Sequence, residues 1–66
     1  MTPTDFHAAL DALDWTQRGL ARLLRVDERQ VRRWASGAYP VPERIASWLA
    51  TLAAFHASHP PPPKAP

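Results

Sequence analysis

The chain has 66 residues, 45% of them hydrophobic, and no cysteine, so we expect one small domain that no disulfide and no cysteine-based zinc site supports. It has no apolar run near the ~18 residues of a membrane span and no signal-peptide pattern, which favours a cytoplasmic protein. The net charge is only +2, but residues 18–33 hold six of the eight basic residues against two acids, a net of +4. Such a local field favours a polyanionic partner such as nucleic acid.

Few glycines and few β-branched residues predict an all-α fold, a compact bundle of four or five short helices. The first helix is expected over 3–13. Thr2 suits the N-cap, Pro3 the first helical position and Asp5 the acid of a capping box. The inward side then carries Phe6, Ala9, Leu10 and Leu13 at helical spacing.

The second helix is expected to begin after Thr16, a good N-cap, and to end at residue 24. Trp15 and Leu20 have the spacing of a hydrophobic staple. The predicted apolar stripe is Leu20, Ala21, Leu23 and Leu24. Arg25 and Val26 then form a very short connection to the next helix.

The third helix is expected over about 28–35, with Asp27 as its N-cap and Gly37 as its stop. At 100° per residue, Val31 and Trp34 lie on one side. The opposite side carries Glu28, Arg29, Arg32 and Arg33, with Gln30 between the two. Trp34 could instead stack on single-stranded nucleic acid, but its position favours the core.

Pro42 is expected to open a fourth helix that runs to about residue 57, after the rigid loop "AYPVP". Its apolar stripe is Ile45, Trp48, Leu49, Leu52 and Phe55. Three short helices cannot easily cover this stripe, so Trp48, Leu52 and Phe55 are expected to face a second copy of the chain; the alternative is that they complete the monomer core. The domain therefore spans 1–58, and the proline-rich tail 59–66 is expected to be extended and disordered, although it could also bind an SH3-like groove.

No set of residues indicates catalysis. His56 and His59 lack further ligands nearby in sequence, and Ser47 and Ser58 lack a histidine and carboxylate partnership. We therefore expect no enzyme, no metal, no cofactor and no small-molecule ligand.

Two helices joined by about three residues, the second with a basic outer face, have the layout of a helix-turn-helix. At this point "TQRGLARLLRVDERQVRRWASG", residues 16–37, resembles the helix-turn-helix of the Cro and phage-repressor-like (XRE-type) family of DNA-binding proteins. The resemblance extends over roughly 6–55 and implies a lambda-repressor-like fold. The chain is also similar to small prophage-type regulators, in which "SG" leads through a proline-containing loop into a fourth helix.

The resemblance implies a role for each matching position. Base edges in the major groove would be contacted by Glu28, Arg29 and Arg33, and the sugar-phosphate backbone by Gln17 and Ser36. Arg32 lies on the same side of the helix and is expected to reach base edges as well. Further backbone contacts are expected from Arg18, Gln30, Tyr39 and Arg44. The residue pattern alone leaves two alternatives open, because the arginines could form a solvated face and Glu28 could simply favour a helix N-terminus.

Three positions depart from the family pattern. Arg25 stands where the turn usually has glycine, and a positive φ there would cost around 1 kcal/mol. Gly19 replaces a frequent glutamate, which removes a capping-box partner. The loop after the third helix lacks the family's basic residues, which leaves Tyr39 and Arg44 as candidates.

The sequence thus predicts a regulator, most simply a repressor, that binds an inverted-repeat operator in double-stranded DNA as a homodimer, and the resemblance adds autoregulation of its own promoter. The alternative is a protein-interaction or antitoxin-like adaptor that retains the fold, with the arginines facing an acidic partner and the fourth helix as its working surface.

Overall fold

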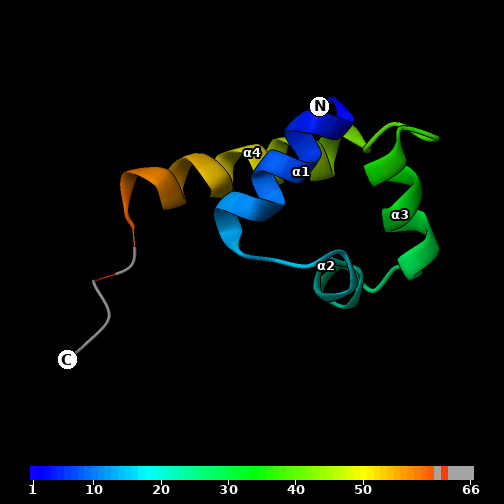
Figure 1. Cartoon of the computed structure of the whole chain (residues 1–66), viewed down its shortest axis with the longest axis horizontal. Helices are drawn as coiled ribbons and strands as arrows, with labels where there is room; N and C mark the ends of the chain where they lie inside the picture. Colours follow the sequence, from blue (N-terminus) through cyan, green and yellow to red (C-terminus); the bar gives the residue numbers. More distant parts are fainter. Residues whose placement is uncertain (61, 63–66) are drawn as a thin grey trace.

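The computed structural model describes residues 1–60 and 62, and within these residues the chain is all-helical, with no strand (Figure 1). The four helices are α1 (Pro3–Leu13), α2 (Gln17–Leu24), α3 (Glu28–Ser36) and α4 (Glu43–Ser58). The predicted all-α fold is therefore confirmed, and the predicted bounds differ by at most one residue. The extended tail is predicted for 59–66, of which residues 61 and 63–66 lie outside the described part.

The first three helices begin at the predicted caps. The Asp5 backbone N–H donates to the Thr2 hydroxyl (3.0 Å), and the Thr2 backbone N–H donates to the Asp5 carboxylate (3.1 Å), which completes a capping box. The Gly19 N–H donates to the Thr16 hydroxyl at 2.9 Å. Helix α4 begins after Pro42, which is its N-cap and provides no side-chain bond.

The two short connections use the same turn. Asp14 and Arg25, which end α1 and α2, are both left-handed, with φ of 57°. The next residue bonds back across the last turn: Trp15 N–H donates to the Leu10 carbonyl (2.9 Å), and Val26 N–H donates to the Ala21 carbonyl (3.0 Å). This is the Schellman arrangement, which satisfies carbonyls at a helix end, and the following apolar residue packs half-buried against the core. The positive φ expected at Arg25 is confirmed.

The core lies where α1 packs against both α3 and α4, while α2 packs against α3. Figure 1 shows α2 nearly end-on and α3 side-on, so the two helices joined by the short turn cross steeply. His7 Nε2 donates to the Ala35 carbonyl at 3.0 Å, so α1 also caps the end of α3. The buried side chains are Phe6, Ala9, Leu10, Leu20, Ala21, Val31, Trp34, Ala35, Val41 and Leu49.

Three large apolar side chains of the predicted stripes are exposed. Leu23 is 57% exposed, Trp48 36% and Phe55 62%. On α2, the buried arc runs from Leu20 to Ala21, and Leu23 lies about 60° outside it. Phe55 lies on the last turn of α4, beyond the packed length of α1. Val41 is buried instead, although the sequence indicates only a rigid loop there.

Candidate nucleic-acid interface

Helix α3 has one buried side and one exposed side. Val31 and Trp34 are buried, and the Trp34 ring meets the Phe6 ring edge-on at 6.3 Å. Arg29, Arg32 and Arg33 are exposed on the other side. The core location expected for Trp34 is thus confirmed, because its ring is not available for stacking on a base.

The first turn of α3 carries two ion pairs that involve predicted contact residues. Arg18 Nε, at the start of α2, lies 3.7 Å from Glu28 Oε1, and Arg29 Nη2 lies 3.4 Å from Asp27 Oδ2. The Arg29 backbone N–H also donates to Asp27 Oδ1 at 2.8 Å. This hydrogen bond lowers the pKa of Asp27, so the cap is ionised at neutral pH. Glu28 and Arg29 therefore have intramolecular partners in the free chain.

The second turn of α3 is connected to the loop that follows it. The Arg33 guanidinium lies over the Tyr39 ring, 5.4 Å from its centroid, within the range of a cation–π contact. The Tyr39 N–H and the Ser36 hydroxyl both donate to the Arg33 carbonyl, at 3.3 and 3.2 Å. Ser36 also accepts from the Ala38 N–H, so its hydroxyl is already engaged in the turn that ends α3.

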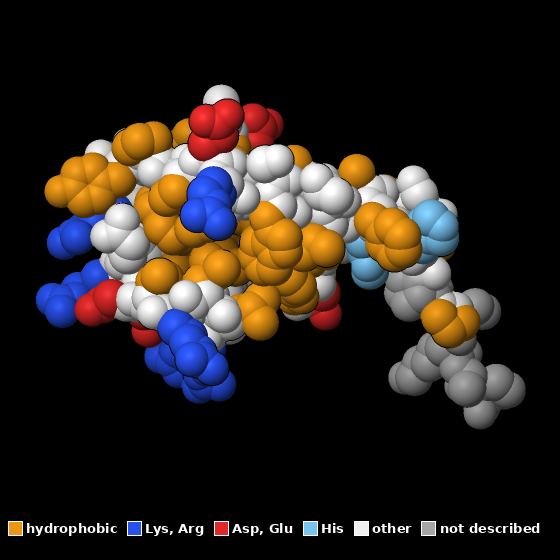
Figure 2. Space-filling model, turned by 180° about the vertical axis from the view of Figure 1, so that it is seen from behind, with side chains coloured by type: hydrophobic (Ala, Val, Ile, Leu, Met, Phe, Trp, Pro, Cys, Tyr) orange, Lys and Arg blue, Asp and Glu red, His pale blue; other side chains and the backbone are white. Residues whose placement is uncertain are grey.

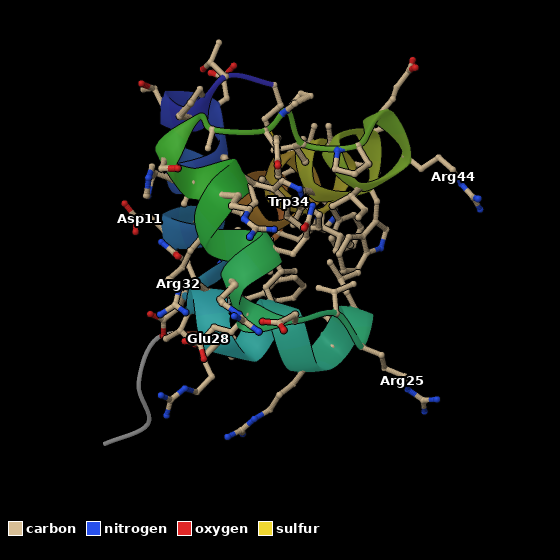
Figure 3. All side chains as sticks on the ribbon, turned by 90° about the vertical axis from the view of Figure 1, so that its right-hand side faces the viewer. Asp11, Arg25, Glu28, Arg32, Trp34 and Arg44 are labelled. Atoms are coloured by element: carbon tan, nitrogen blue, oxygen red, sulfur yellow. The ribbon has the colours of Figure 1, made fainter. Side chains whose placement is uncertain are left out.

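The predicted contact residues fall into two groups. Those of α2 and α3 lie together, because the short turn holds the start of α2 beside the start of α3; they include the half-buried Gln17 and Gln30. Arg44 lies apart, on the first turn of α4. Figure 3 shows it extending to the opposite side of α3 from Arg32, on the same side as Arg25.

Arg22 and Arg25 are not among the predicted contact residues. Both line a shallow hollow of about 390 Å³ with Arg18, Val26 and Glu28. The sequence spacing could have indicated this basic cluster, since Arg18 and Arg22 are four residues apart on α2 and Arg25 follows three residues later. In Figure 2, the basic side chains lie over the half of the molecule that holds α2 and α3, and none is seen at the far end of α4.

The stripe predicted to face a second copy has three different environments. The Trp48 ring lies 5.8 Å from the Trp15 ring, Leu52 is half-buried, and the Phe55 ring stacks on the His59 ring at 4.3 Å. No charged residue occurs in 45–58. Helix α4 therefore ends in an exposed, uncharged and largely apolar segment.

The described residues contain no group of three or more histidine, cysteine or carboxylate side chains that could hold a metal ion. Within the same part of the chain, no helix is both long enough and apolar enough to cross a membrane. Comparisons of the chain with protein-family models, with curated proteins and with solved structures find no match.

Proposed function

We propose that this chain is a sequence-specific, double-stranded DNA-binding regulator, most simply a repressor, in which α2 and α3 form a helix-turn-helix and α3 enters the major groove. The observation that carries the proposal is the division of α3. Its apolar side is buried in the core, and its other side presents Arg29, Arg32 and Arg33 to solvent.

The chemistry of this surface suits a major groove. A groove of about 12 Å admits one α-helix, and a guanidinium can bond to guanine O6 and N7 at once. Glu28 can accept from cytosine N4 when it leaves Arg18, which is then released for a phosphate. Because the Glu28 and Arg29 pairs are exposed, exchanging them for DNA contacts costs little.

The backbone contacts extend the proposal around α3. Gln17 and Arg18 begin α2 and would bind a phosphate beside the groove, with Gln30 and Ser36 flanking the base contacts. Tyr39 would hold Arg33 through its ring, and Arg44 would approach the strand on the other side. Phosphate contacts of this kind fix the register without reading sequence.

We further propose that the regulator acts as a homodimer on an inverted repeat. Figure 1 shows that α4 extends away from α3, so a twofold axis parallel to α4 keeps both α3 helices on one side. The contact between the two copies would lie on the outer half of α4, at Leu52 and Phe55. The Trp48 ring would stay packed against the Trp15 ring of its own chain. Half-site centres would then be about 34 Å apart, one turn of DNA.

Selection of binders from random duplex DNA at about 0.15 M salt tests the proposal. We expect an enriched inverted repeat with half-sites one turn apart. In a second selection, Arg33→Ala should relax the preference at one base pair and weaken the wild-type site by about 1–3 kcal/mol.

The folded state of each variant is checked by circular dichroism, so that a loss of signal reports on binding. Equal weakening on all sequences would make Arg33 a phosphate contact. No enrichment from folded protein would overturn the DNA proposal and favour the protein-interaction module.

A further inference from the structure

A shallow apolar hollow lies beside the proposed DNA contact, with which it shares only Arg44. Its volume is about 460 Å³, and it lies between the end of α2 and the first half of α4. The residues that line it, called here the back-face hollow, are Leu24, Pro42, Arg44, Ile45 and Trp48. Trp48 is 36% exposed, a large area for an aromatic ring beside a core. Figure 2 shows apolar side chains gathered at the centre of this face, with arginine side chains above and below them.

Arg44 lines the back-face hollow, and Arg25 follows its lining residue Leu24 in the chain. Figure 3 shows Arg44 above and Arg25 below, both extending to the same side of the molecule, while Arg32 points to the other. Among the described residues, neither Arg25 nor Arg44 has a carboxylate within ion-pair distance. Glu43, the carboxylate nearest to Arg44 in sequence, lines the neighbouring hollow that Arg44 and Trp48 also border. An apolar floor is thus flanked by two cations without ion-pair partners.

This combination does not suit a DNA backbone, because phosphates and sugars offer little apolar surface to cover Leu24, Ile45 and Trp48. It also does not suit a second copy in a DNA-competent dimer. In such a dimer, two copies would contact through their back faces and be related by a twofold axis that keeps both α3 helices on one side. This axis would place Arg25 of one copy opposite Arg44 of the other. Like charges would then meet on both sides of the contact.

We propose that the back-face hollow docks an amphipathic helix of another protein, with apolar side chains at i and i+3 or i+4 seated on Trp48 and with Asp or Glu on both flanks paired with Arg25 and Arg44. Helix-in-groove recognition uses this spacing, and charged flanks set orientation and partner choice. The hollow lies beside the DNA-facing side of α3, and the partner helix and the DNA strand would compete for Arg44, while the base contacts of α3 stay free. The inference does not rest on DNA binding.

A display library of helical peptides tests the proposal directly on the isolated chain. Each peptide carries a fixed apolar stripe, and the flanking positions are randomised among Asp, Glu, Asn, Gln, Lys and Arg. We expect the peptides selected on the wild-type chain to be enriched in Asp and Glu at the flanking positions. On the double variant Arg25→Glu with Arg44→Glu, the enriched flanks should become Lys and Arg, and the wild-type peptide should bind roughly tenfold more weakly.

The signals of two tryptophans, Trp48 and Trp34, locate the bound peptide. In ¹H–¹⁵N spectra, the indole signal of Trp48 should shift on addition of the enriched peptide. That of Trp34, buried against Phe6 elsewhere in the core, should not. Phe55→Gln, on the outer half of α4, is the matched control and should leave the selection unchanged.

Three outcomes would overturn the proposal. Binding of the peptides with no charge preference at the randomised flanking positions would show a nonspecific apolar surface. An unchanged selection on the double variant would show that Arg25 and Arg44 do not pair with the flanks of the peptide. Dissociation of a dimer by the double variant in sedimentation would make the back face a contact between copies.

Discussion

Arg25 has a left-handed backbone conformation, which is unfavourable for a residue with a long side chain. Left-handed φ and ψ cost an L-residue about 1–2 kcal/mol, and Arg25 adopts φ 57° and ψ 43°. Glycine avoids this strain but loses more entropy on folding, by roughly 0.5–1 kcal/mol. Arg25→Gly should therefore raise the free energy of unfolding by up to about 1 kcal/mol in urea titrations. Asp14→Gly is the matched control, and because aspartate tolerates this region better than arginine, its gain should be smaller. A loss of stability in Arg25→Gly would mean that the guanidinium stabilises the turn.

Asp27 gives the start of α3 a pH dependence. Because the Arg29 backbone N–H donates to its carboxylate, the pKa of Asp27 is lower in the folded chain than in the unfolded chain. Its contribution to stability is therefore fully present above the ordinary aspartate value of about 3.9 and is lost as pH falls through the lower folded value. Asp27→Asn keeps an acceptor but does not titrate. The stability difference between wild type and Asp27→Asn, followed by thermal unfolding, should be constant near neutrality and shrink below about pH 4. Asp5, whose pKa is lowered by Thr2, is present in both proteins and cancels. A pH-independent difference would contradict this interpretation.

At the scale of the elements, α4 is attached by its inner half and exposed at its outer half. Leu49 is fully buried, and Phe55, six residues later, is 62% exposed. Leu49→Ala should cost about 2–5 kcal/mol, since it removes buried surface and leaves a cavity. For so small a domain this approaches the whole stability. Phe55→Ala, a larger truncation on the same helix, should change stability by less than about 0.5 kcal/mol. Denaturant unfolding at low protein concentration, where any dimer has dissociated, measures both. Similar losses in the two variants would show that the outer half of α4 packs in the monomer.

The helices could be predicted because their signals are local. Thr2, Thr16 and Asp27 cap the backbone within a few residues of themselves, and Gly37 stops α3 with its positive φ of 85°. The two sides of α3 could be predicted for the same reason, since Val31 and Trp34 lie on the side opposite the arginines in any helix.

Features that depend on how the helices pack could not be read from the sequence. The Trp15 and Trp48 rings, 33 positions apart, meet because α4 packs against α1, which ends shortly before Trp15. The burial of Val41, the bond from His7 to Ala35 and the separation of Arg44 from Arg32 depend on the same packing. The repeated turn at Asp14 and Arg25 could have been found, because each is followed by an apolar residue and an N-cap.

At the scale of the whole molecule, charge and apolar surface are separated along its length. The arginines lie on the half that holds α2 and α3, and residues 45–58 carry no charge. A polyanion would be drawn to one end, while the other end is left free for contact with another chain. The proposed regulator uses both ends, since dimer contact by α4 would set the spacing of the two α3 helices.

This separation predicts that dimerisation can be removed without loss of the DNA contact. Leu52→Gln with Phe55→Gln should leave the chain folded and monomeric in sedimentation, because the changes lie outside the buried core. Affinity for a single half-site should be unchanged, whereas affinity for the inverted repeat should fall by a factor on the order of 10² or more, since two linked sites gain that much from effective concentration. Arg33→Ala is the matched comparison, because it should weaken half-site and full-site binding and leave the dimer intact. If wild type is monomeric and binds the full site no better than the half-site, α4 has no part in DNA recognition.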